Sequence, residues 1–247
     1  MVAFAAAVQF LLISPVFIRR PFTPMEVGRS TAFFPLVGLL LGGLLAAADL
    51  LLAGIFPVQV RSALVLALWI VLTGALHFDG LLDACDGLLG GGTPERRMQI
   101  MRDERTGAYA VAGGALILLT MFSAVNAIEQ ERWAALLLAP VLGRCGMTLS
   151  VVVFPYARAA GLGRDIKDQA GHVQAAAAML TTLVMVGILT WQLQDLVAAT
   201  AFVSAAIVWW LASGFVMRKI PGMTGDTYGA INMLVEAGVL LTFAAAR

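Results

Sequence analysis

The chain has 247 residues, of which 60% are hydrophobic and 13% are charged, and its formal net charge is +1. Soluble globular proteins are about half apolar and a quarter charged, so this composition excludes an ordinary soluble domain and indicates an integral membrane protein. No basic stripe stands out from the apolar background, which argues against a nucleic-acid partner. We therefore expect a lipid bilayer around the chain and no nucleic acid bound to it.

The apolar segments predict the number of membrane spans. A hydrocarbon core of about 30 Å requires about 20 apolar residues per helix. In chain order the candidates are 2–18, 32–56, 62–78, 108–128, 133–156, 173–193, 196–217 and 228–246. The first is the weakest, because it is short and contains Gln9, Ser14 and Pro15. We predict an all-α, polytopic integral membrane bundle of about eight transmembrane helices, seven plus a first helix that either spans, re-enters or lies in the interface. All 247 residues are assigned to one membrane domain.

The basic residues predict the orientation of this bundle. Cytoplasmic loops of membrane proteins are enriched in Lys and Arg. One set of alternate loops holds 12 of the 16 basic residues, the other set holds three, and Arg144 lies within a span. This division favours eight spans with the basic loops in the cytoplasm. The long loops belong to the basic set, so catalytic loops are expected around 79–107, 157–172 and 218–227 on the cytoplasmic face.

Three aspartates follow the third apolar segment, in the stretch HFDGLLDACDGLLGGG that begins at His77. Asp79, Asp83 and Asp86 are spaced i, i+4 and i+7, so on a continuing helix all three project from one face. Close carboxylates repel one another unless a cation lies between them, and Mg²⁺ prefers hard oxygen ligands. The spacing predicts catalytic, metal-binding carboxylates, whereas the alternative is that they only cap a helix end. His77 is either a ligand-binding residue or a hydrogen-bonding anchor.

An arginine-rich segment comes next, in GGGTPERRMQIMRDERTGAYA. Thr93 and Pro94 have the pattern of an N-cap and first helical residue, so 94–103 is predicted to be a short interfacial helix. Its arginines either carry cytoplasmic surface charge or bind phosphate oxygens, which suit their planar geometry. These candidate substrate-binding residues are Arg96, Arg97, Arg102 and Arg105. Beside a carboxylate-held metal, they indicate pyrophosphate chemistry.

A third polar cluster, GMTGDTYGAINMLVE, leads into the final apolar segment. The glycines around Thr224 and Asp226 suit backbone amides that bend around an anion. Glu236 lies inside an apolar helix, where an unpaired charge is costly. We expect Glu236 either to have a functional role or to pair with a neighbouring span, for instance with Arg144.

With the blocks HFDGLLDACDG, RRMQIMRDERTGAYA and GMTGDTYGA, the sequence resembles the cobalamin synthase family, the adenosylcobinamide-GDP ribazoletransferases. The blocks occur in the family's order, and the pattern extends over nearly the whole chain. The resemblance implies a Mg²⁺-dependent enzyme of late vitamin B12 assembly in the bacterial inner membrane. The implied substrates are adenosylcobinamide-GDP and α-ribazole or α-ribazole 5'-phosphate, and the implied products are adenosylcobalamin or its phosphate and GMP.

Residue chemistry and resemblance together give a mechanistic hypothesis. Metal held by Asp79, Asp83 and Asp86 bridges the pyrophosphate of the activated corrinoid, and the arginines offset the charge on the leaving GMP. One carboxylate, with Asp86 as the first candidate, accepts the proton of the attacking ribazole hydroxyl. From the resemblance and from its cytoplasmic position, Asp226 is expected to contribute to the site from outside the group of three aspartates. The oligomeric state stays open, a homo-oligomer included.

Two other classes are kept as alternatives. A CDP-alcohol phosphotransferase also places aspartates at a cytoplasmic helix mouth, and DGLLDACDG supplies the D-x3-D pair of its motif, but no Ala-Arg follows the Asp-Gly at the required distance. A divalent-cation transporter also aligns carboxylates, although near mid-membrane and on broken helices.

Overall fold

The computed structural model describes residues 2–246, and every named element in that range is a helix. The elements are α1 (Val2–Leu11), α2 (Pro24–Ser30), the short 3-10 helix η1 (Thr31–Phe33), α3 (Phe34–Leu52), α4 (Val58–Leu72), α5 (Leu76–Leu89), α6 (Pro94–Ile100), α7 (Ala108–Ala127), α8 (Arg132–Val153), α9 (Leu162–Gln169), α10 (His172–Leu193), α11 (Val197–Met217) and α12 (Gly225–Ala245). The all-α prediction is confirmed.

Within residues 2–246, six helical stretches are long and apolar enough to cross a bilayer. They are the joined α2, η1 and α3, followed by α7, α8, α10, α11 and α12. The pair α4 and α5 adds a seventh candidate, although its two helices meet at 88°. Helix α1 has 10 residues and is too short to span a hydrocarbon core of about 30 Å. The chain is therefore a multi-pass helical membrane protein, close to the predicted number of spans.

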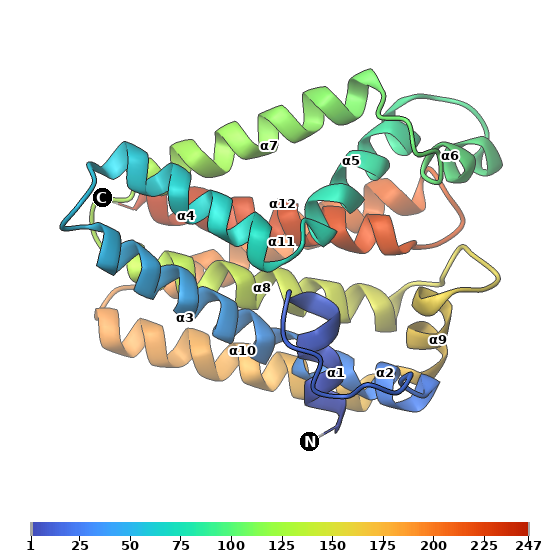
Figure 1. Cartoon of the computed structure of the whole chain (residues 1–247), viewed down its shortest axis with the longest axis horizontal. Coiled ribbons are helices and arrows are strands. Elements are labelled where there is room, and N and C mark those ends of the chain that lie inside the picture. The colour runs from blue at the N-terminus through green and yellow to red at the C-terminus, as the bar shows by residue number, and fades with distance from the viewer. Residues whose placement is uncertain (1, 247) are drawn as a thin grey trace.

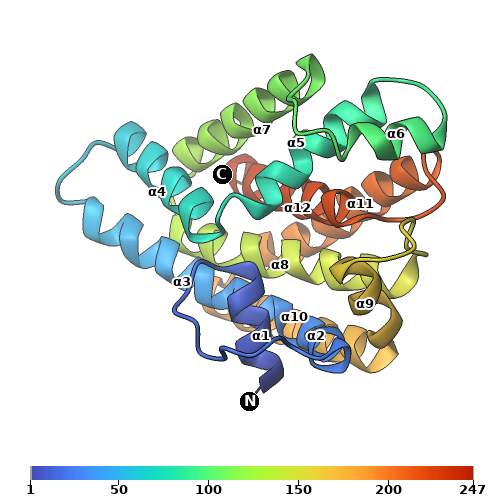
Figure 2. The ribbon, with the colours of Figure 1, turned by 45° about the vertical axis from the view of Figure 1, so that its right-hand side comes forward.

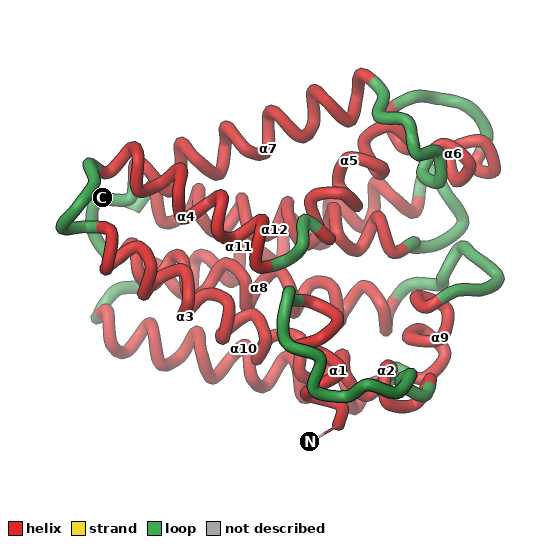
Figure 3. The backbone as a smooth tube through the Cα atoms, viewed as in Figure 1, coloured by secondary structure: helices red, strands yellow, loops and turns green. Residues whose placement is uncertain are grey.

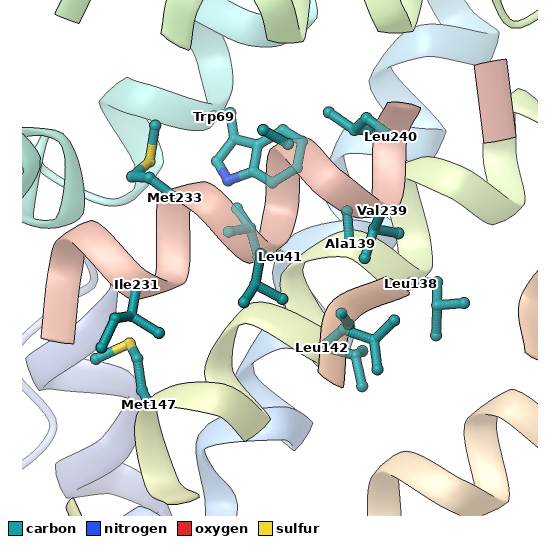
Figure 4. Packing of buried hydrophobic residues seen from close by; sticks show 14 of the residues in the cluster. Leu41, Trp69, Leu138, Ala139, Leu142, Met147, Ile231, Met233, Val239 and Leu240 are labelled. Atoms are coloured by element: carbon teal, nitrogen blue, oxygen red, sulfur yellow. The ribbon is translucent and has the colours of Figure 1, made fainter. Parts of the chain in front are cut away.

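The centre of the bundle is formed by α8 and α12, which are the most deeply buried of the candidate spans. Figure 4 shows their side chains packed with Leu41 of α3 and Trp69 of α4 in one hydrophobic cluster. In contrast, α10 and α11 expose large apolar side chains such as Leu180, Trp191 and Trp210. Such an exposed apolar surface is stable in lipid and not in water.

The bundle has two unlike ends (Figures 1 and 2). The turns from α3 to α4, from α7 to α8 and from α10 to α11 lie at one end, with the C-terminus. Helices α6 and α9 lie at the other end, with the loops that precede α7, α9 and α12 (Figure 3). The basic set of loops defined from the sequence therefore gathers at the α6–α9 end.

The third apolar segment differs from its prediction in one respect. A continuous helix was expected over 62–78 and onward through the aspartates, but α4 ends at Leu72. Gly74 and Ala75 both adopt left-handed backbone conformations, with φ of 59° and 57°, and α5 then starts in a new direction. Two consecutive residues in this region cannot continue a right-handed helix. The aspartates consequently lie on a separate helix that is steeply inclined to α4.

Two carboxylates that pair with arginine stabilise the interior. Arg144 of α8 and Glu236 of α12 are both fully buried and their side chains are 2.9 Å apart. This confirms the structural reading of Glu236. At the turn end of the bundle, Asp49 of α3 lies 2.8 Å from Arg132 and 3.1 Å from Arg61.

Candidate active site

The aspartate face of α5 lines a cavity of about 300 Å³, which we call the acidic cleft. Asp79, Asp83 and Asp86 all line it, so the structure confirms that they share one face. Most other lining residues come from the segment 101–106, including Arg102 and Arg105. The fold thus brings the three carboxylates together with two of the four candidate arginines.

Asp79 and Asp83 are the unpartnered members of this group. Asp79 is exposed and Asp83 half-buried, and neither side chain has a hydrogen bond or an ion pair with any described residue. Like charges on one helix face raise each other's energy, and a bound cation removes that penalty. These two carboxylates are therefore available to a ligand.

Asp86 is engaged differently, because its carboxylate connects α5 to the start of α7. One oxygen accepts a hydrogen bond from the amide of Gly107 at 2.6 Å, and the other from the amide of Ala110 at 2.9 Å. Amides in the first turn of a helix otherwise lack partners, and a carboxylate there is favoured by the helix dipole. A side chain at Gly107 would place its Cβ 2.7 Å from the carboxylate, so the contact requires glycine. Asp86 is thus partly occupied by a structural role.

The four candidate arginines separate into two pairs. Arg97 is buried, and its guanidinium donates to the carbonyl oxygens of Gly87 and Leu88 at the end of α5. Arg96 is exposed and its nearest polar partner is Gln99, at 3.4 Å. Helix α6 itself begins as predicted, with the Thr93 hydroxyl accepting from the amide of Arg96. The cleft is therefore served by the other pair, Arg102 and Arg105.

Arg105 forms an ion pair with Asp103 at the rim of the cleft, with a separation of 2.8 Å. Its hydrogen bonds hold the pKa of Asp103 at about 2, so Asp103 stays ionised throughout the neutral range. The Arg105 side chain is 89% exposed and that of Asp103 40% exposed, so solvent screens the pair and it contributes little to stability.

Asp226 lies beside α5 because α5 and α12 cross at glycines. A Cβ on Gly80 would lie 2.9 Å from the carbonyl oxygen of Asp226, and one on Gly229 would lie 3.1 Å from that of His77. Because glycine has no side chain, α5 and α12 can approach each other closely at these two positions. Asp226 is therefore adjacent to the aspartate helix, as expected for a contributing residue.

Arg158 is a site residue that the sequence reasoning missed, since it was counted only as loop charge. Its guanidinium forms an ion pair with the carboxylate of Asp226. The pairing depends on two hydrogen bonds of 2.8 Å that tie Pro155 and Ala157 to Met223. No local sequence motif predicts a contact between loops so far apart in sequence. Arg158 thereby places a positive charge at the mouth of α12.

A second cavity, of about 370 Å³, adjoins the acidic cleft, and we call it the aromatic pocket. Tyr156 and Tyr228 stack on its wall with ring centroids 6.2 Å apart, and burial raises the pKa of Tyr156. His77 also lines it and is 2% exposed. Asp79 and Arg102 line both cavities, so the two spaces meet at these residues.

The donor set suits a hard divalent cation that is shared with a ligand. In the described part of the chain, no group of three or more His, Cys, Asp or Glu side chains is arranged to hold an ion alone. Mg²⁺ commonly takes one or two carboxylates, with substrate phosphate oxygens and water completing its shell. The open carboxylate oxygens of the acidic cleft fit that mode.

The fold and the two cavities define a multi-pass membrane protein whose polar chemistry is concentrated at one end of its bundle. The family model for cobalamin-5-phosphate synthase matches residues 3–244. The chain belongs to this family, and is a transferase of cobalamin biosynthesis.

Curated relatives extend over nearly the full length of the chain. A protein from Stutzerimonas stutzeri is 42% identical over 240 residues, which cover 96% of each chain. One from Pseudomonas savastanoi pv. phaseolicola is 41% identical over 250 residues, covering 99% of each, and one from Geotalea daltonii is 38% identical over 239 residues, covering 97% of this chain and 95% of the relative. All three are named adenosylcobinamide-GDP ribazoletransferase. No solved structure matches. The resemblance stated from three sequence blocks is confirmed.

Proposed function

We propose that the protein joins adenosylcobinamide-GDP to α-ribazole, or to α-ribazole 5'-phosphate, in a Mg²⁺-dependent phosphoryl transfer that releases GMP. The observation that carries this proposal is the acidic cleft, where Asp79 and Asp83 lack partners among the described residues and lie beside two arginines. The names of the curated relatives support the same reaction. They favour it over a CDP-alcohol phosphotransferase and over a cation transporter.

In this proposal Asp83 and Asp86 hold Mg²⁺ on the acidic cleft, each with oxygen lone pairs left for a ligand. The ion, when bound, supplies positive charge that polarises the diphosphate oxygens. Arg102 and Arg105 bind the remaining phosphate oxygens and offset the charge that develops on GMP.

Asp79 is proposed as the general base in place of Asp86. It lines both cavities, whereas both oxygens of Asp86 already accept backbone amides. The ribazole hydroxyl attacks the corrinoid-side phosphorus, its proton passes to the Asp79 carboxylate, and the bond to the GMP oxygen breaks. Arg158 keeps Asp226 in place beside this centre.

We further propose that the cleft faces the cytoplasm. The α6–α9 end of the bundle carries the basic set of loops, and Lys and Arg are enriched in cytoplasmic loops of membrane proteins. The proposed activated corrinoid carries a charged diphosphate, which fits a site open to the aqueous side.

The test is turnover by the purified protein in liposomes with adenosylcobinamide-GDP and α-ribazole. With Mg²⁺ we expect the corrinoid product and GMP in equal amounts, separated by chromatography, and with EDTA we expect neither. Full turnover in EDTA contradicts the metal dependence. Transfer from a CDP-activated alcohol, or ion flux without product, contradicts the reaction itself.

A further inference from the structure

We propose that the aromatic pocket is the acceptor subsite, which binds the benzimidazole base of ribazole with a hydrogen bond from the Tyr228 hydroxyl. The diphosphate of the activated corrinoid then occupies the acidic cleft. This inference rests on the proposed function and assigns one substrate to each of the two cavities.

The two cavities differ in chemistry although they share Asp79 and Arg102. The aromatic pocket is bounded by apolar side chains from several helices, among them Phe34 and Met147, and by the stacked Tyr156 and Tyr228. A flat apolar base packs well against such walls, and tyrosine rings favour offset or edge contacts with it. The acidic cleft presents mostly charged groups, and its two arginines together with a cation held by its carboxylates suit a diphosphate.

Among the described residues, two buried polar side chains in the aromatic pocket have no hydrogen-bond partner. They are the Tyr228 hydroxyl and the ring nitrogens of His77. Tyr228 is 5% exposed and His77 is 2% exposed. Neither group has a hydrogen-bond partner within residues 2–246. Buried polar atoms are normally hydrogen-bonded, so a ligand is expected to complete them. A benzimidazole nucleoside offers one unsubstituted ring nitrogen as an acceptor for Tyr228, and ribose hydroxyls for His77.

Size and polarity exclude the other candidate occupants. Small-molecule pockets usually enclose about 300–1,000 Å³, and at about 370 Å³ this one is at the lower end of that range. A nucleoside fits this space, whereas a corrinoid ring is far larger. Guanine has donors and acceptors around its edge, whereas Arg158 and Asp226 of the lining already pair with each other and most of the remaining walls are apolar.

Two variants with matched controls test the assignment. Tyr228→Phe removes the hydroxyl alone, and its control is Tyr109→Phe, on the exposed surface of α7. Ala160→Trp fills the pocket from an exposed loop, and its control is Ala159→Trp, the exposed neighbouring residue outside the pocket lining. Each protein is reconstituted in nanodiscs and titrated with α-ribazole alone, followed by benzimidazole fluorescence. The KM for each substrate is measured separately.

We expect Tyr228→Phe to raise the Kd and KM for ribazole about tenfold, the effect of losing one good hydrogen bond. Ala160→Trp should raise them further, while the KM for adenosylcobinamide-GDP and both controls stay at wild-type values. If the variants instead raise only the KM for adenosylcobinamide-GDP, the assignment is overturned. Wild-type turnover with unaltered ribazole binding in both variants overturns the subsite alone. If the wild type binds ribazole and the variants do not, but the wild type shows no turnover, the subsite is supported and the proposed function is overturned.

Discussion

The carboxylates at the two ends of the bundle have opposite surroundings. At the turn end, Asp49 is paired with Arg132 and Arg61, and Arg132 also donates to the Val125 carbonyl at 2.6 Å and the Ser62 hydroxyl at 3.1 Å. At the α6–α9 end, Asp79 and Asp83 share a cavity and have no such partner among the residues described. The Arg144–Glu236 pair in the interior resembles the first case. In this protein, the absence of an arginine partner separates carboxylates that can serve chemistry from those that hold helices together.

The largest effect is expected from removing the unpartnered charges. Asp79→Asn and Asp83→Asn should each lower kcat by about 10²- to 10⁴-fold, the range typical for loss of a catalytic proton acceptor or a comparable charge. Unfolding temperatures in detergent should stay close to wild type, because neither side chain holds another residue. The control is Asp168→Asn, an exposed carboxylate paired with Arg164, which should retain activity. Full turnover by folded Asp79→Asn and Asp83→Asn would contradict the conclusion that the unpaired carboxylates at the α6–α9 end serve catalysis.

The sequence predicted much of this contrast. The i, i+4, i+7 spacing correctly placed three aspartates on one face, and helical capping residues located α6. The spacing could not show that Asp86 accepts amides from α7, or that Arg97 turns back to the end of α5. Those partners come from the tertiary arrangement, which local periodicity does not encode.

Removing the paired carboxylate at the turn end should lower stability and leave activity intact. Asp49→Asn leaves Arg132 and Arg61 without their shared counter-charge, and breaking such a buried pair typically costs about 3–5 kcal/mol. Thermal unfolding in detergent should show this loss, while the fraction that remains folded should keep wild-type KM values. Asp195→Asn, at an exposed helix start at the same end, is the control. A stable Asp49→Asn protein that lacks turnover would reverse the roles assigned to the two ends.

The smallest expected effect distinguishes two adjacent arginines. Arg97→Ala removes the donor to the Gly87 and Leu88 carbonyls and should lower the free energy of unfolding by about 1.5–3 kcal/mol, the usual contribution of hydrogen bonds to charged groups. Arg96→Ala, at an exposed position, should change stability little. Denaturation in detergent compares the two. Equal stability of both variants, with loss of substrate affinity in Arg97→Ala, would return Arg97 to the substrate-binding group.

The bend between α4 and α5 was the main feature of the fold that sequence reasoning did not foresee. The apolar run through residue 78 has the composition of one span, and hydropathy does not report the backbone conformation of Gly74 and Ala75. Arg158 was missed for a related reason, because its place beside Asp226 depends on pairing between two distant loops. Composition and periodicity predicted the elements and the charged groups, whereas the turns and loop contacts that assemble them required the structure.

The most direct test of the central claim is metal binding itself. Mn²⁺, used in place of Mg²⁺ and followed by electron paramagnetic resonance, should bind the wild type in the presence of adenosylcobinamide-GDP. Asp83→Asn should lose this binding, Asp79→Asn should retain it while failing to turn over, and Asp168→Asn should match the wild type. Mn²⁺ affinity in Asp83→Asn equal to that of the wild type would contradict the claim that Asp83 of the acidic cleft holds the metal.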